Sequence, residues 1–199
     1  MKKIYLVRHG KRESYTEDTL LSELGVKQAE LTGKYFKDKK INQIYASPMP
    51  RTQQTAKIIS EILNLDIKTD DRLRERLVWG DRENESFEEF LEQWDKATID
   101  RNYRPKNGDS SILSGKRLEK VLEDIPEDQV SLVIAHAGII GDYLLNHFPP
   151  DLLPFQRDPL DSVLHVEILE CSITEIHLLK EKTNLIRVND ASHLSAPLV

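Results

Sequence analysis

The sequence contains only one cysteine, Cys171, in 199 residues. One cysteine excludes a disulfide within the chain and favours a reducing compartment, although pairing between two chains stays open. No arginine follows it at a distance of six residues, which excludes the phosphate-binding loop of the cysteine-based phosphatases. We expect Cys171 to be buried for structural reasons.

Long apolar runs are absent as well. Only a short apolar stretch precedes Arg8, which is far less than the core of a signal peptide. No later run approaches the length of a membrane span. We therefore expect a cytoplasmic protein without a membrane partner.

The chain has no excess of positive charge, since 28 Lys and Arg stand against 34 Asp and Glu and give a formal net charge of -6. This argues against a nucleic-acid partner. It also indicates that the basic cluster between Lys2 and Arg12 serves one local site in the protein. No Pro/Gly/Ser-rich linker or internal repeat divides the sequence, so we expect one domain over residues 1–199. The sequence does not indicate the oligomeric state.

Motifs for metals and organic cofactors are also missing. The sequence has no His-x-His or Cys-x-x-Cys pair, no P-loop and no dinucleotide glycine pattern. We expect chemistry carried out by the side chains, with no cofactor and no metal.

The sequence does contain an alternation of short apolar runs with amphipathic stretches. It predicts an α/β fold: a single three-layer α/β/α domain with a mostly parallel sheet and helices on both faces. Three later alternating runs are expected to be antiparallel strands at one side of the sheet. The predicted strands are 4–7, 43–46, 67–69, 130–135, 163–168, 173–179 and 185–188. The first predicted helix follows Ser22 as its N-cap, has Leu24, Leu31, Tyr35 and Phe36 on its apolar face, and carries the basic stretch 37–40 at its C-terminal end. The other predicted helices are 51–63, 86–97, 110–125 and 139–148.

The first predicted strand ends abruptly at Arg8, His9 and Gly10. A guanidinium can hold a phosphoryl group bidentately, and a neutral imidazole nitrogen can attack phosphorus. The glycine lets the backbone turn or lets a ligand come close. For this tripeptide alone, a strand that simply ends in polar residues is the commoner alternative.

Two more predicted strands are followed by basic residues. Ser47 to Pro50 breaks the second run, and Arg51 then stands in the first turn of a helix, where free N–H groups attract anions. Val130 to Ala135 is followed by His136. Since ligands bind beyond the carboxyl ends of parallel strands, we expect these residues to join the first pair around a phosphate-sized dianion. A solvent-exposed arginine is the alternative for Arg51.

Several motifs follow one another along the chain in a recognisable order. They are Val7-Arg8-His9-Gly10, Leu21-Ser22-x-x-Gly25-x-x-Gln28-Ala29, Ser47-Pro48-x-x-Arg51-Thr52-x-Gln54-Thr55-Ala56, Leu73-x-Glu75 and Val133-x-x-His136-x-Gly138. Together they resemble the histidine phosphatase superfamily, also called the phosphoglycerate mutase-like family. The resemblance covers nearly the whole chain.

The resemblance implies roles for five residues. His9 would be the nucleophile that becomes phosphorylated, and water would then cleave the phosphohistidine. Arg8, Arg51 and His136 would hold the phosphoryl oxygens, and Glu75 would be the general acid for the leaving oxygen. For Glu75 taken alone, a surface salt bridge is the alternative.

The sequence departs from the family pattern at two places. Lys11 to Tyr15 stand where members often carry Glu-Thr and then an asparagine that touches phosphate. Ala137 replaces the usual glycine after the second histidine, which keeps a backbone N–H for phosphate but narrows the space. We also expect Lys11, Arg76 and Arg104 as contacts to the phosphate or to a second anionic group of the substrate, with plain surface charge as the alternative.

The stretch at about residues 76–110 differs in composition from its surroundings, with both tryptophans, many acidic residues and a basic-aromatic group. We interpret it as an insertion above the sheet that forms a lid. A second packed helical layer is the alternative.

The sequence as a whole indicates a metal-independent phosphatase that hydrolyses a small, anionic phosphorylated metabolite through a phosphohistidine on His9. A cofactor-dependent phosphoglycerate mutase is the first alternative, although known ones are somewhat longer. A noncatalytic phosphate- or phosphoprotein-binding domain is the second, and the presence of two histidines, two arginines and a candidate acid argues against it.

Overall fold

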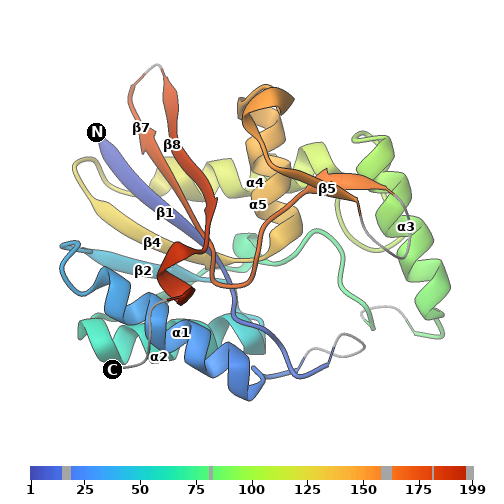
Figure 1. The fold of residues 1–199 in the computed structure, drawn as a ribbon. Coiled ribbons are helices and arrows are strands. Elements are labelled where there is room, and N and C mark those ends of the chain that lie inside the picture. Colours follow the sequence, from blue (N-terminus) through green and yellow to red (C-terminus); the bar gives the residue numbers. More distant parts are fainter. Residues whose placement is uncertain (15–18, 81–82, 158–162, 181, 196–199) are drawn as a thin grey trace.

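A computed structural model describes the chain except for residues 15–18, 81–82, 158–162, 181 and 196–199. A six-stranded sheet in the order β3-β2-β4-β1-β7-β8 forms its centre (Figure 1). The strands of this sheet are β1 (Lys2–Arg8), β2 (Gln43–Ala46), β3 (Ile67–Thr69), β4 (Val130–Ala135), β7 (Ile173–Leu178) and β8 (Thr183–Asp190). The helices are α1 (Glu23–Phe36), α2 (Pro50–Leu63), α3 (Phe87–Ile99), α4 (Ser111–Asp124) and α5 (Ala137–His147).

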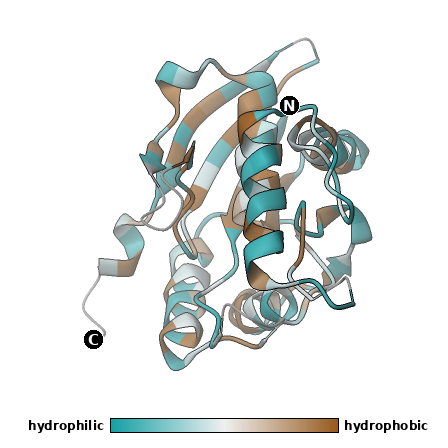
Figure 2. Cartoon of the chain, turned by 90° about the vertical axis from the view of Figure 1, so that its right-hand side faces the viewer, coloured by the Kyte–Doolittle hydropathy of each residue, from teal (hydrophilic) through white to brown (hydrophobic). Residues whose placement is uncertain are grey.

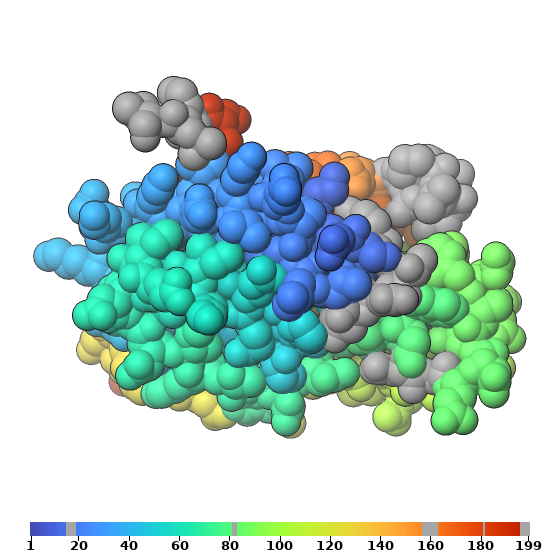
Figure 3. Space-filling view, turned by 90° about the horizontal axis from the view of Figure 1, so that it is seen from below, coloured from blue at the N-terminus to red at the C-terminus, as the bar shows by residue number. Residues whose placement is uncertain are grey.

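The sheet is parallel from β3 to β1 and antiparallel at β7 and β8. Helices α1 and α2 cover one face and α4 and α5 the other (Figure 1), so the predicted α/β architecture with helices on both faces is confirmed. Seen from below, the blue and teal atoms of α1 and α2 cover much of the near face, with green atoms of the α3 region to one side (Figure 3). In Figure 2 several strands carry brown segments, whereas the helix facing the viewer is largely teal.

The alternation of side chains along β1 explains the two cores. Ile4 and Leu6 pack into the cluster beneath α4 and α5. Tyr5 and Val7 pack into the cluster beneath α1 and α2, because neighbouring residues of a strand point to opposite faces. β1 is therefore buried on both sides, as expected for a central strand of a parallel sheet.

Helix α1 begins where the sequence predicted, since the Ser22 hydroxyl accepts from the Gly25 N–H at its N-terminus. Its predicted apolar face is partly wrong, because Leu24 is 51% exposed. The buried face instead carries small residues such as Ala29 and Gly33. A Cβ at Gly33 would lie 2.6 Å from Ile62 Cδ1 of α2, so α1 packs closely on α2 there.

The prediction of three antiparallel strands beside the sheet is correct for two of them. Residues 173–179 and 185–188 fall in β7 and β8. The stretch 163–168 forms β6 (Leu164–Val166), which pairs with β5 (Phe155–Arg157) in a separate two-stranded sheet. β7 occupies the edge of β1 opposite β4, so β6 has no partner there.

The stretch at 76–110 contributes α3, which lies at one end of the molecule beyond α5 (Figure 1). A capping box starts this helix, with the Ser86 hydroxyl accepting from the Glu89 N–H and the Glu89 carboxylate accepting from the Ser86 N–H. Movement of this stretch as a lid stays a prediction, and its residues 81–82 lie outside the described part, as does Tyr15. Among the described residues, no helix is long and apolar enough to cross a bilayer.

Candidate active site

The parallel register brings three strand ends to one edge of the sheet. Arg8 of β1 pairs with Ala135 of β4, and Ala46 of β2 pairs with the preceding residue of β4. The next residues along the chain are His9, Ser47 and His136, so these three side chains start from the same edge. This confirms that the strand ends converge, as the sequence predicted.

His9 is 4% exposed and is held by its own loop. Its Nδ1 lies 2.7 Å from the Gly10 carbonyl oxygen, which can only accept, so Nδ1 carries the proton. Burial, followed by the charges of Arg8 and Arg51, holds the pKa of His9 well below 6.5. The ring is therefore neutral at pH 7, with its lone pair on Nε2.

Arg51 connects the two histidines. It is the second residue of α2 and is 4% exposed, so the solvent-exposed alternative is wrong. Its Nε donates to His9 Nε2 at 3.1 Å, and its Nη2 donates to His136 Nδ1 at 3.1 Å. The cation thus faces Nε2 of His9, the residue for which the family resemblance implies the role of nucleophile.

His136 is the N-cap residue of α5 and is fully buried. Since arginine only donates, His136 Nδ1 accepts from Arg51, and Nε2–H donates to the Ser47 hydroxyl at 2.9 Å. Burial, then the positive charge of Arg51, holds the pKa of His136 well below 6.5. Its ring centre lies 5.3 Å from that of His9.

Two polar side chains at this site were not assigned a role from the sequence. Ser47 accepts from His136, as described above, and Thr55 accepts from the Gly10 N–H at 3.1 Å. Thr55 lies one helical turn after Arg51, on the same face of α2, and this spacing is the sequence feature that could have identified it as a residue of the site. Gly10 has no room for a side chain, because a Cβ there would lie 2.6 Å from the Gly25 carbonyl oxygen.

Arg8 starts at the same edge, but its guanidinium is held by a distant segment. Nη1 donates to the Ile168 carbonyl at 2.6 Å and Nη2 to the Glu170 carboxylate at 3.2 Å. Its Nε is buried and has no hydrogen-bond partner among the described residues. The Cys171 N–H donates to the Arg8 carbonyl at 3.0 Å, so the same segment also fixes the backbone.

Cys171 itself is fully buried, as expected from the sequence. Burial raises the pKa of its thiol to about 12. A thiol that stays protonated is a poor nucleophile, so the role of this residue is structural.

Glu75 sits at the N-terminus of α5, the helix that His136 caps. Its Oε2 accepts from the Gly138 N–H at 3.0 Å, and its Oε1 accepts from the Ile139 N–H at 2.9 Å and the Arg76 N–H at 2.8 Å. Free N–H groups at a helix start favour an anion. The surface salt bridge considered for Glu75 is therefore wrong, because backbone groups of the site hold its carboxylate.

Gly138 provides the space that Glu75 needs. A Cβ at this position would lie 2.5 Å from Glu75 Oε1 and 2.8 Å from Trp94 Cη2. Ala137, which precedes it, is the first residue of α5, and its N–H is one of the helix-start donors at this edge. Within the described part of the chain, no group of three or more His, Cys, Asp or Glu side chains is arranged to hold a metal ion.

Comparison with known proteins agrees with this geometry. Residues 4–191 match the family model described as "Histidine phosphatase superfamily (branch 1)". The chain belongs to the histidine phosphatase superfamily. The resemblance carried by the sequence motifs is thereby confirmed.

Individual members of the superfamily are similar over most of their length. A putative phosphoserine phosphatase 2 of Hydrogenobacter thermophilus is 32% identical over 97% of this chain and 98% of its own. A probable phosphoglycerate mutase GpmB of Yersinia pestis is 33% identical over 71% of this chain and 72% of its own. The fold matches Entamoeba histolytica phosphoserine phosphatase in complex with 3-phosphoglyceric acid, with a TM-score of 0.72 and 20% identity over 98% and 100% of the two chains.

Superfamily membership together with the first relative identifies the chain as a phosphatase, a phosphoric monoester hydrolase.

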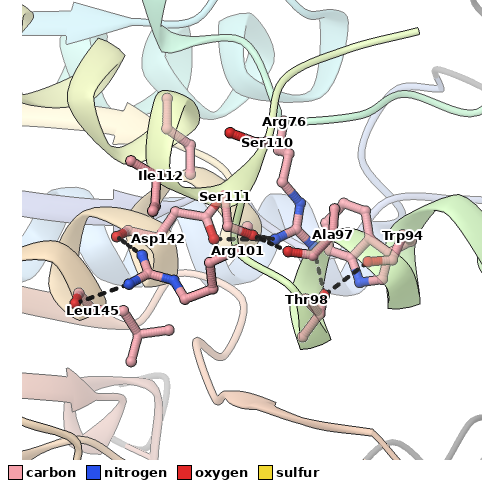
Figure 4. Close-up of polar contacts among 12 residues, drawn as sticks. Arg76, Trp94, Ala97, Thr98, Arg101, Ser110, Ser111, Ile112, Asp142 and Leu145 are labelled. Atoms are coloured by element: carbon pink, nitrogen blue, oxygen red, sulfur yellow. Dashed lines mark hydrogen bonds and ion pairs between the residues drawn. The ribbon is translucent and has the colours of Figure 1, made fainter. Parts of the chain in front are cut away.

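One substrate contact proposed from the sequence lies elsewhere in this histidine phosphatase. Arg76 is 4% exposed, and its Nη1 donates to the Ser111 hydroxyl at 2.5 Å and to Asp142 at 3.0 Å (Figure 4). Its Nη2 donates to the Thr98 hydroxyl at 2.9 Å, and its guanidinium lies 4.0 Å from the centre of the Trp94 ring. The expected phosphate contact of Arg76 is replaced by a buried ion pair that connects α3, α4 and α5.

Lys11 and Arg104 are both exposed. The Lys11 backbone is bound at the start of α1, where its N–H donates to the Gln28 side chain and its carbonyl accepts from Ser22. Arg104 lies between α3 and α4. Substrate contact by these two side chains stays a prediction.

Arg76→Met is expected to lower the free energy of unfolding by about 3 kcal/mol, because it leaves the buried carboxylate of Asp142 without its cation. Urea unfolding at pH 7 measures this loss. The double variant Arg76→Met/Asp142→Leu is expected to recover most of it and to keep the KM for an aryl phosphate. A raised KM in the double variant would instead support the substrate contact.

The neutral state of His9 is expected to make stability depend on pH. Below pH 6.5 the unfolded chain takes up a proton on His9 while the folded chain does not, so acidification destabilises the folded state. As the pH is lowered, the unfolding free energy of the wild type is expected to fall more steeply than that of His9→Gln. The two slopes are expected to differ by up to about 1.4 kcal/mol per pH unit. Urea unfolding at several pH values below 6.5 tests this, and equal slopes would contradict the neutral assignment.

Proposed function

We propose that this phosphatase hydrolyses a small phosphomonoester through a phosphohistidine on His9, without a metal ion. The observation that supports it most is the state of His9: a buried, neutral ring with its proton on Nδ1 and its lone pair on Nε2, facing Arg51. A nitrogen lone pair fixed beside a cation suits attack on a phosphoryl group, because the cation stabilises charge on the equatorial oxygens.

The first half-reaction forms the bond from His9 Nε2 to phosphorus and breaks the bond from phosphorus to the ester oxygen. Arg51 turns its donors from the two histidines to the phosphoryl oxygens, which frees the Nε2 lone pair. The negative charge of the bound phosphoryl group favours protonation of His136, which then donates from Nδ1 while Nε2 keeps its bond to Ser47. Arg8 adds a donor from the same edge of the sheet, and Ala137 adds its backbone N–H. As general acid, Glu75 takes up a proton when the negatively charged substrate binds beside it and gives that proton to the leaving oxygen, so the product is a neutral alcohol.

The second half-reaction returns the enzyme to its starting state. Glu75, now a carboxylate, takes a proton from water as the water attacks phosphorus. The bond from His9 to phosphorus breaks, and inorganic phosphate leaves. Atoms and protons balance over the two steps, and no metal is required because the cationic side chains stabilise the charge.

The substrate we propose is a small, anionic phosphorylated metabolite. The printed names of the relatives support this choice, since one is a putative phosphoserine phosphatase and another was solved with 3-phosphoglyceric acid. A cavity of about 260 Å³ beside Glu75 gives room for a small leaving group. Its lining mixes basic and acidic side chains, Arg74, Arg76 and Arg117 with Asp71 and Asp109.

A mutase is the second candidate, because relatives named phosphoglycerate mutase GpmB match 71% of the chain. A mutase would use the same first half-reaction but return the phosphoryl group to a second hydroxyl. Glu75 and His9 would then act in both directions. The two candidates differ only in what accepts the phosphoryl group.

Phosphate release from p-nitrophenyl phosphate and from a panel of phosphorylated metabolites, measured in EDTA, tests the proposal. We expect release that EDTA does not reduce, with a preference for one anionic metabolite. Transfer between phosphoglycerates without release would favour the mutase. If neither release nor transfer is observed, catalysis is contradicted, and the noncatalytic phosphate- or phosphoprotein-binding domain remains as the alternative.

A further inference from the structure

Arg117 of α4 holds the backbone of the segment that presents Glu75. Its Nη1 donates to the Arg72 carbonyl at 2.6 Å and to the Arg74 carbonyl at 2.7 Å, and its Nη2 donates to the Glu75 carbonyl at 3.4 Å. We propose that Arg117 is a positioning residue for proton transfer by Glu75. The inference rests on the general-acid role of Glu75 in the proposed function.

The local backbone explains why an arginine is needed there. Residues Asp71–Leu73 form a single 3-10 turn, and Arg74 then adopts an extended conformation with φ -58° and ψ 154°. A turn this short leaves its last carbonyls without helical partners. One guanidinium with several donors in a fixed plane can hold neighbouring carbonyls together while its Nε keeps a further partner, whereas an ammonium has fewer donors and no fixed plane.

A neighbouring loop orients Arg117 in turn. The Asp109 carboxylate accepts from Arg117 Nε at 2.9 Å, and the Asp109 N–H donates to the Arg76 carbonyl at 3.0 Å. Gly108 has a φ of +121°, and a Cβ there would lie 2.5 Å from the Arg76 carbonyl oxygen. Arg117, Asp109 and Gly108 therefore hold the backbone on both sides of Glu75.

This arrangement bears on proton transfer because the carboxylate of Glu75 has little freedom of its own. Its oxygens are bound by three backbone N–H groups, two of them from α5. The backbone carbonyls held by Arg117 fix the other end of the same residue. A shift of this segment would move the acid away from the leaving oxygen, and a displacement of about 1 Å costs a proton transfer about 100-fold.

The inference is tested by comparing two esters that differ in their need for an acid. An alkyl phosphate needs protonation of its leaving oxygen, whereas p-nitrophenolate leaves without it. In Arg117→Met we expect kcat/KM for the alkyl ester to fall by about 10- to 100-fold more than that for p-nitrophenyl phosphate. The ratio of the two values does not depend on the fraction of folded enzyme, so a loss of stability cannot imitate the result.

Two further variants sharpen the comparison. Arg117→Lys keeps the charge but has fewer donors and no fixed plane, so its ratio is expected to lie between wild type and Arg117→Met. Arg187→Met is the matched control, because Arg187 of β8 also holds two acceptors, Glu175 and Asp190, away from Glu75. Its ratio is expected to stay at the wild-type value.

The possible failures can be told apart. If wild type hydrolyses both esters and Arg117→Met slows them equally, the positioning role is wrong and the proposed function stands. If Glu75→Gln also slows both esters equally, the general-acid role fails. If wild type hydrolyses neither ester, the proposed function itself is contradicted.

Discussion

His9→Ala is expected to lower kcat/KM for every substrate by about 10⁴-fold or more, because the substitution removes the atom that forms the bond to phosphorus. Binding of phosphate is expected to survive, since Arg51 and His136 stay in place and Arg51 loses the histidine acceptor with which phosphate competes. Steady-state phosphate release and calorimetric titration with inorganic phosphate measure the two quantities.

A matched variant separates loss of the nucleophile from a general effect of removing a histidine. His177→Ala on β7 removes a ring that contacts Glu175 and is expected to keep wild-type turnover. If His9→Ala retained more than about a hundredth of the wild-type kcat/KM, another group would have to be the nucleophile.

Arg51→Met is expected to lower kcat/KM by about 10³-fold, because the arginine touches both histidines and is placed to hold the phosphoryl oxygens. It should also change the pH profile. The charge of Arg51 lowers the pKa of His9, so its removal raises that pKa towards 6.5. Activity requires neutral His9, and the acidic limb of the kcat/KM profile therefore moves to higher pH.

Arg51→Lys controls for charge in this experiment. The lysine keeps a cation near His9 but loses the planar pair of donors, so activity is expected to fall while the acidic limb moves less than in Arg51→Met. A profile of Arg51→Met whose acidic limb stays at the wild-type pH would contradict the electrostatic coupling of Arg51 and His9.

The centre of the site followed from the sequence because it depends on strand order alone. His9 and His136 follow buried parallel strands, and Arg51 stands in the first turn of the helix after a third, so all three lie at one edge of the sheet. This geometry does not depend on details of packing. Local sequence patterns placed two further features: N-cap preference placed the start of α1 at Ser22, and a short apolar run gave the bounds of β4.

Contacts between segments far apart in the sequence could not be predicted. Arg8 is bound by Ile168 and Glu170, about 160 residues later, and no local sequence pattern indicates that contact. Arg76 was expected to contact the substrate or to be a surface charge, but its partner Asp142 lies on a helix whose apolar neighbours gave no sign of a buried charge. Arg117 was missed because a surface position on α4 explains an arginine equally well.

The most direct test of the account is to trap the phosphorylated enzyme. Wild type mixed with p-nitrophenyl phosphate, quenched rapidly in alkali and digested, is expected to carry one phosphoryl group on the peptide that contains His9. The His9→Ala variant is expected to carry none. Turnover by wild type with no phosphorylated His9, or with the phosphoryl group on another residue, would contradict the phosphohistidine route.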